Sequence, residues 1–251
     1  MWVLAGRIKI SAVSKSKIAL RTGYQYQLQG LVYNLIDKHS ADWLHNEGFK
    51  FEKRRYPLFN FSEILERGRY DSDLKIFTFS GQISFYISSP VNWILEQIAK
   101  NAVTKDELKL GQNNIIITAI EVFKQLDIDK KKVRVNCLTP IEVHSTLTKA
   151  DGAKKTYYYS PDEREFSEFV NENLRKKWFS LYQKDCPYNL KISPVNIKYN
   201  KERKRNFKGT IIKGWSGHFY LEGDKELIEL AFDTGLGSRN SAGWGMVELV
   251  I

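Results

Sequence analysis

Residues 235–250, GLGSRNSAGWGMVELV, form the most distinctive stretch of this 251-residue chain. Four glycines fall in its first eleven residues, after a predicted helix and before a predicted final strand. Glycine adopts positive φ without steric cost, so such a loop can approach a ligand closely, and its N–H groups can bind a phosphate beside Arg239. Tight turns without a ligand explain the same glycines equally well. The dinucleotide-binding fingerprint is excluded, because the loop follows a helix and has Asn240 where that motif needs glycine.

One order of elements occurs twice along the chain. In the first half, a strand over residues 3–10 precedes a helix whose apolar residues between Leu28 and Ile36 recur at helical spacing. Ser89 and Pro90 predict the N-cap and first residue of a second helix. The remaining predicted elements of this half are strands at 58–65, 74–79 and 82–87, the second helix from 91, and a strand at 114–123.

The second half repeats that order after a polar, basic stretch at residues 125–132. Ser160 to Glu163 is a capping box that predicts the start of a long helix. The other predicted elements are strands within 133–147 and 157–159, a hairpin pair at 190–199 and 210–221, a helix at 226–232 and a strand at 245–251. Two βαββαβ copies predict an α+β fold of two tandem ferredoxin-like domains, residues 1–127 and 128–251.

The charge balance indicates a polyanionic partner. Lys and Arg number 39 against 29 Asp and Glu, so the net charge is +10. With 13 Tyr, 14 Phe and 6 Trp available for base stacking, nucleic acid is the first candidate. The charge alone also suits an anionic membrane surface or simple solubility.

Several classes of protein are excluded by what the sequence lacks. No apolar run reaches the roughly 18 residues of a membrane helix, and residues 1–16 lack the apolar block of a signal peptide. Cys137 and Cys186 are far apart and have no metal-ligand spacing. We therefore expect a cytoplasmic protein with two reduced thiols, no metal, no cofactor and no membrane contact.

The densest positive run is KYNKERKRNFK at residues 198–208. Its position between two predicted strands indicates a protruding basic hairpin tip. Tyr199 and Phe207 flank the charges, and such interleaving favours stacking on unpaired bases together with phosphate contact. A solvated loop is the alternative interpretation. A second basic cluster, Lys53-Arg54-Arg55, follows the first helix.

The glycine loop and its MVELV strand resemble the C-terminal signature of the CRISPR-associated precursor-RNA endoribonucleases, which belong to the repeat-associated RNA-binding superfamily. Three segments of the first half also resemble that family: YQYQLQGLVYNLI at 24–36, WLHNEGF at 43–49 and PLFNFS at 57–62. The similar segments lie at both ends of the chain. The resemblance implies a tandem ferredoxin-like enzyme that cuts CRISPR repeat RNA within each repeat to make guide RNAs.

Transferred residue by residue, the resemblance places the family's catalytic histidine at His45 and its helix tyrosine at Tyr33. Some members carry a lysine immediately before a Leu-Phe pair, and this chain has Pro57 there. The catalytic cation is then expected from the cluster at residues 53–55, with Lys53 as our choice, and Tyr56 is a further candidate donor.

The chemistry explains these residue types. RNA carries its own nucleophile, the 2′-OH, so cleavage without a metal needs a base, an acid and stabilisation of the phosphorane. The expected products are a 5′-OH and a 2′,3′-cyclic phosphate. The alternatives are a polar helix-end role for His45 and burial for Tyr33. His39 is the most credible substitute catalyst, whereas His144 and His218 are expected to pack or to contact RNA.

The residues expected to bind RNA come from the basic clusters and the glycine loop: Arg54, Arg55, Lys201, Arg203, Lys204, Arg205, Gly235, Gly237, Arg239, Asn240, Ser241 and Gly243. The rival hypothesis is a non-catalytic subunit that binds repeat RNA on the same scaffold. A general tandem RNA-recognition protein is a third, because residues 75–79 faintly match its aromatic strand pattern. A multisubunit interference complex and a homodimer are both compatible with the sequence.

Overall fold

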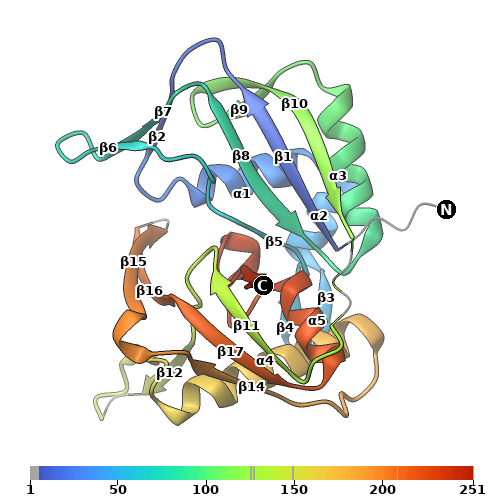
Figure 1. Ribbon diagram of the computed structural model, residues 1–251, viewed down its shortest axis with the longest axis vertical. Helices are drawn as coiled ribbons and strands as arrows, with labels where there is room; N and C mark the ends of the chain where they lie inside the picture. Colours follow the sequence, from blue (N-terminus) through green and yellow to red (C-terminus); the bar gives the residue numbers. More distant parts are fainter. Residues whose placement is uncertain (1–5, 125, 127, 149, 208, 251) are drawn as a thin grey trace.

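The computed structural model describes residues 6–124, 126, 128–148, 150–207 and 209–250. Figure 1 shows two halves stacked along the long axis, the N-terminal half in blue to green and the C-terminal half in yellow to red. Each half contains one antiparallel sheet with helices packed on it. The predicted mixed α+β class is therefore confirmed. Residues 3–5 and 251, which we expected to belong to the first and last strands, lie outside the described residues.

The first half has a five-stranded sheet in the order β5-β8-β1-β10-β9. Its strands are β1 (Arg7–Val13), β5 (Asn60–Phe61), β8 (Gln82–Ser88), β9 (Leu108–Leu110) and β10 (Asn113–Phe123). Helices α1 (Gln25–Asn34) and α3 (Asn92–Thr104) follow β1 and β8 in the sequence. Without the edge strand β9, the second, third, first and fourth strands stand side by side, which is the ferredoxin-like order.

The second half repeats this spatial order as β14-β17-β11-β18. Its elements are β11 (Lys132–Cys137), α4 (Arg164–Tyr182), β14 (Leu190–Pro194), β17 (His218–Gly223), α5 (Lys225–Thr234) and β18 (Val247–Leu249). The predicted tandem ferredoxin-like fold is thus the fold of the chain.

One three-stranded sheet and three hairpins are inserted between these core elements. They are the three-stranded sheet of β2 (Ile18–Arg21), β7 (Ile76–Phe79) and β6 (Arg69–Asp71), and the hairpins β3 (Phe49–Phe51) with β4 (Arg54–Tyr56), β12 (His144–Thr148) with β13 (Lys154–Tyr158), and β15 (Lys201–Phe207) with β16 (Thr210–Ser216). Short 3₁₀ helices cover Ile197–Tyr199 and Asn240–Ala242.

The predicted hairpin pair of residues 190–199 and 210–221 is confirmed in part, because β14 in the first range pairs antiparallel with β17, which begins at His218 in the second. Residues 210–216 of the second range form β16, which pairs with β15, and β15 holds residues 201–207 of the basic run. Residues 201–207 of the run therefore form one strand of a hairpin and not the loop at its tip. The predicted strand at 58–65 is also too long, since only Asn60–Phe61 pairs with β8.

Helix starts differ from the predictions as well. Ser89 does not cap α3 directly: its Oγ accepts from the N–H of Val91, 3.1 Å away, and the helix begins at Asn92. The predicted capping box forms its reciprocal bond, because the Glu163 carboxylate accepts from the N–H of Ser160, but α4 begins only after Glu163.

The residues around His45 form a helix of their own, α2 (Lys38–Asn46). α1 ends near Leu35, and Asp37 has the extended ψ of 141° that starts α2. The helix predicted from the apolar residues at 28–36 therefore does not continue to His45, which lies in a separate helix. The break matters for the site, because it turns His45 back towards α1.

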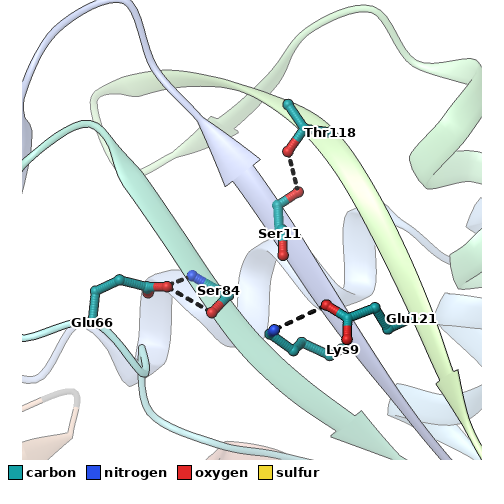
Figure 2. Close-up of polar contacts among 6 residues, drawn as sticks. All are labelled: Lys9, Ser11, Glu66, Ser84, Thr118 and Glu121. Carbon is teal, nitrogen blue, oxygen red and sulfur yellow. Dashed lines mark hydrogen bonds and ion pairs between the residues drawn. The ribbon is translucent and has the colours of Figure 1, made fainter.

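The sheet of the first half has one apolar and one polar face. Along β1, Ile8 and Ile10 are fully buried, while Lys9 and Ser11 alternate with them on the other face. Figure 2 shows that polar face, where the Lys9 ammonium lies 2.9 Å from a Glu121 carboxylate oxygen. None of the helices in the described ranges is long and apolar enough to cross a lipid bilayer.

Candidate functional site

His45 and Tyr33, the two residues expected to carry proton transfer, lie together. His45 is an exposed residue in the last turn of α2, and Tyr33 projects from α1. Their ring centroids are 6.1 Å apart, in an edge-to-face arrangement. The Tyr33 ring also packs edge-to-face on Phe59, with centroids 5.3 Å apart. The tyrosine is thus fixed by packing while the imidazole remains accessible.

Burial controls the protonation of Tyr33. Removal of the phenol from water disfavours the phenolate and raises the pKa of Tyr33 to about 12. At neutral pH the hydroxyl is therefore protonated. It can donate a hydrogen bond or a proton to a substrate oxygen, but it cannot act as the base.

The basic cluster lies on the β3–β4 hairpin, directly after α2. Gly48 makes the connection with a φ of 57°, where a Cβ would lie 3.2 Å from the carbonyl oxygens of Leu44 and Tyr56. The Arg55 guanidinium donates to the carbonyl of Asn46, the residue after His45. This contact holds the hairpin against the end of α2.

The same hairpin also packs on the second half. Phe51 of β3 lies edge-to-face against Phe179 of α4, with ring centroids 5.3 Å apart. The hairpin therefore sits where the two halves meet.

A cleft of about 400 Å³ lies at this junction. It is lined by residues from the hairpin, from α4 and from the glycine loop: Lys53, Arg54, Arg55, Tyr56, Pro57, Leu58, Phe59, Asn173, Lys177, Thr234, Ser238, Arg239, Asn240 and Ser241. No carboxylate is among these lining residues, whereas five carry a basic group. The cleft is therefore suited to a polyanion. Phe59 lines the cleft and also packs on Tyr33, so the cleft lies next to the Tyr33–His45 pair.

Lys177 is a cleft residue that the sequence did not single out. Its side chain is buried, and its ammonium donates to the carbonyls of Gly235 at 2.7 Å and Gly237 at 3.4 Å. Burial lowers the pKa of Lys177 to about 7. The available signal was a lysine in the apolar stripe of the predicted helix, between Leu174 and Leu181.

The glycine loop is mostly buried against the first half. Gly243 approaches β5 so closely that a Cβ there would lie 2.7 Å from the ring of Phe61. The Asn240 amide donates to the carbonyls of Leu236 and Trp244 within the loop. The glycines therefore have a packing role, which leaves mainly Ser238, Arg239 and Ser241 facing the cleft.

The expected phosphate cradle of successive main-chain N–H groups is largely occupied. The N–H of Ser238 donates to the carbonyl of Glu142, and that of Gly245 donates to Pro140, each at 2.8 Å. The N–H of Gly243 likewise bonds within the loop, to the Asn240 carbonyl. Arg239, exposed and in the left-handed conformation with a φ of 58°, is the loop's principal group for an anion.

The basic strand β15 divides into exposed and buried residues. Lys201, Arg203 and Lys204 are exposed, outside the cleft. Arg205 instead turns inward: it pairs with Glu63 of the first half, donates to the carbonyl of Gly243 and lies 4.8 Å over the Trp244 ring. The first three stay candidates for RNA contact, whereas Arg205 joins the two halves.

The comparisons with known proteins identify the family. The C-terminal model described as "CRISPR associated protein Cas6, C-terminal" matches residues 122–249, and the N-terminal model of the same family matches residues 19–121. The chain belongs to the Cas6 family of CRISPR-associated proteins.

A curated relative from Methanocaldococcus jannaschii, named CRISPR-associated endoribonuclease Cas6 1, is 29% identical over 96% of this chain and 91% of its own length. A solved Cas6 structure has a TM-score of 0.78 at 26% identity, covering 98% of this chain and 99% of that one. A structure described as a RAMP protein binding different RNA substrates has a TM-score of 0.80 at 20% identity, covering 98% and 99%, and supports the fold. The predicted family of endoribonucleases is confirmed.

Within the described part of the chain, His, Cys, Asp and Glu residues form no group of three or more that is suited to hold a metal ion. Cys137 and Cys186 are free thiols, as the sequence predicted.

Proposed function

We propose that this Cas6 protein is a metal-independent endoribonuclease that cuts CRISPR repeat RNA within each repeat to generate guide RNAs. The observation that carries the proposal is the His45–Tyr33 pair, which lies beside a basic cleft without carboxylates. The curated Cas6 relative, named an endoribonuclease, supports the same reaction class.

The reaction follows from the groups at hand. His45 removes the proton of the 2′-OH, whose oxygen then bonds to the adjacent phosphorus. The bond from phosphorus to the 5′-oxygen breaks, and this oxygen receives the hydroxyl proton of Tyr33, so the products are a 2′,3′-cyclic phosphate and a 5′-OH. The protonated imidazole of His45 then returns a proton to Tyr33, which restores both residues. Lys53, supported by Arg54 and Arg55, stabilises the charge of the phosphorane.

The RNA strand is proposed to follow the positive groups across the junction. Arg54, Arg55, Arg239 and Ser241 line the cleft itself, with Asn240 beneath them. Lys201, Arg203 and Lys204 extend the contact along β15, outside the cleft. Gly235, Gly237 and Gly243 act through the shape of the loop. A boundary between domains 1–127 and 128–251 and a cytoplasmic location are part of the same proposal, while self-association and membership of a larger complex stay predictions.

Cleavage of a synthetic repeat RNA in excess EDTA tests the proposal. We expect cutting to persist, with 5′-OH and 2′,3′-cyclic phosphate ends, and a single 2′-deoxy substitution at the scissile nucleotide to block it. Loss of cutting in EDTA that Mg²⁺ restores would contradict the mechanism. Tight binding with no cleavage under any condition would instead support the non-catalytic RNA-binding subunit.

A further inference from the structure

A second polar groove, of about 310 Å³, adjoins the basic cleft and shares Arg54, Asn173 and Ser238 with it. Its remaining walls are strand β12 and helix α4 of the second half. His144, Ser145 and Thr146 line it from β12, while Glu172 and Lys176 contribute an ion pair from α4 with atoms 3.2 Å apart. Because that pair is internally neutral, the groove's net positive charge comes from Arg54.

Glu142 explains how these groups are held. Its side chain is fully buried, and one carboxylate oxygen lies 2.6 Å from Nδ1 of His144 and 3.9 Å from Nε of Arg239. Neither carboxylate oxygen has a well-aligned hydrogen bond among the described residues, so the nearby His144 ring and Arg239 guanidinium are the groups that can compensate its burial. An isolated buried carboxylate is costly, so Glu142 ties both partners to one place.

The main chain of Glu142 fixes the glycine loop at the same point. Its carbonyl accepts from the N–H of Ser238 at 2.8 Å, and it forms an isolated parallel bridge with Gly237. A Cβ on Gly237 would lie 2.3 Å from that carbonyl oxygen, so glycine is needed for the approach. Strand β12 and the glycine loop are therefore joined through one residue, with Arg239 on one side and His144 on the other.

His144 is oriented for use from the groove. Its Nδ1 is buried towards Glu142, while a quarter of the side chain remains exposed and lines the groove. The tyrosine ring of Tyr158 lies 6.0 Å from the imidazole, centroid to centroid. Burial and the charge of Glu142 raise the pKa of Tyr158, and Arg239 opposes them, so these groups share one electrostatic environment.

We propose that His144, oriented by Glu142, and Arg239 form a second phosphodiester-binding site, which holds the RNA strand at a phosphate other than the scissile one. The inference rests on the proposed function, because it takes repeat RNA as the ligand. A phosphodiester fits the groove, since it is an anion that accepts from the imidazole of His144, the guanidinium of Arg54 and the hydroxyl of Thr146, while Arg239 lies beside it in the adjoining cleft. Glu142 is a positioning residue in this site, and it does not touch the RNA.

Methylphosphonate scanning tests the site. Each phosphate of a repeat RNA that the enzyme cleaves is replaced in turn by a neutral methylphosphonate, with a 2′-deoxy nucleotide at the cut so that binding alone is measured. We expect several phosphates along the proposed RNA path to be sensitive in the wild-type protein, and at one of them, other than the scissile phosphate, the replacement should weaken binding by about tenfold through the loss of a charge-assisted hydrogen bond to His144. His144→Ala should abolish the effect at that position alone. His218→Ala is the matched control, because His218 begins β17 outside the groove, and it should leave the whole scan unchanged.

Two outcomes would overturn the site: a scan of His144→Ala identical to that of the wild type, or sensitivity confined to the scissile phosphate. The double variant Glu142→Gln, His144→Gln controls for loss of folding, because it replaces the buried carboxylate together with the imidazole and so leaves no unpaired buried carboxylate. It should give the same scan as His144→Ala. If the wild-type protein binds but never cuts repeat RNA, the proposed function fails, while the scan still decides whether the second phosphate site exists.

Discussion

The imidazole of His45 lies edge-to-face against the phenol of Tyr33, with ring centroids 6.1 Å apart and an interplanar angle of 86°. The two residues come from successive helices. The Tyr33 ring also packs against the ring of Phe59, with centroids 5.3 Å apart. The break between α1 and α2 creates this relationship. An exposed titratable ring beside a packed, protonated phenol is a suitable arrangement for a base and a separate donor.

The hydroxyl of Tyr33 can be removed without disturbing this packing. In Tyr33→Phe we expect the single-turnover cleavage rate at saturating RNA to fall by about 10- to 100-fold, because a donor to the reacting phosphate is lost. The free energy of unfolding should change by less than about 1 kcal/mol, since the ring contacts with Phe59 remain. Wild-type cleavage by this variant would limit Tyr33 to a packing role.

Lys177 is expected to make RNA affinity depend on pH. Burial lowers its pKa to about 7 in the free protein, and a phosphate in the cleft would favour the charged ammonium and raise that pKa. Binding then takes up a proton above about pH 7, so affinity should fall as pH rises from there. Lys177→Met should bind with a flatter pH dependence.

Lys176→Met provides the control for Lys177. Lys176 is the adjacent lysine on α4, and its side chain is partly exposed and paired with Glu172. This variant should keep the wild-type pH dependence. If RNA affinity depended on pH equally in the wild type and in Lys177→Met, Lys177 would not change its protonation state on binding.

The exposed basic side chains of β15 should contribute to RNA binding and not to the stability of the fold. Neutralising Arg203 and Lys204 together, as glutamines, should weaken RNA binding and reduce its salt dependence, with little effect on folding, because both side chains are exposed. An unchanged salt slope would assign these residues to a solvated surface.

Arg205→Gln should behave in the opposite way. It removes a buried guanidinium and leaves Glu63 and the Gly243 carbonyl without their partner, so we expect a loss of about 2–4 kcal/mol in the free energy of unfolding. Urea unfolding measures the effect. A stable Arg205→Gln variant with weakened RNA binding would reverse the assignment.

Asp233 should make folding stability decrease with pH. Burial raises its pKa to about 7, although Arg7 opposes the shift. The folded chain therefore binds more protons than the unfolded chain between about pH 4 and 7, and stability should fall as pH rises through that window. Asp233→Asn cannot ionise, so its advantage over the wild type should be about 4 kcal/mol at pH 8 and close to zero at pH 4. Urea unfolding at both pH values is the measurement, and equal differences at the two would contradict the account.

Local patterns in the sequence predicted much of the fold. The helical spacing from Leu28 onwards became α1, and the repeated order of strands and helices became two sheets with the same spatial arrangement. The exact pairing of strands was harder to predict. β14 and β17 are separated by the whole β15–β16 hairpin, and no local sequence pattern indicates that these two strands become neighbours.

The residue types of the site could be predicted from the sequence, but the contacts that hold those residues in place could not. His45, Tyr33 and the cluster at 53–55 came from the family resemblance. The buried ammonium of Lys177 and the contact of Gly243 with Phe61 depend on how the two halves meet, which sequence spacing does not encode. Even so, a lysine in an apolar helical stripe is a signal that can be read in advance.

The most direct measurement of the central claim is the single-turnover cleavage rate of His45→Ala beside that of His39→Ala, with repeat RNA at saturating concentration in EDTA. His39 is the matched control, because it is an exposed histidine earlier in the same helix. The account predicts that His45→Ala loses cleavage by at least about 100-fold while its RNA affinity remains, and that His39→Ala cuts like the wild type. Wild-type cleavage by His45→Ala, or loss of cleavage in His39→Ala alone, would contradict it.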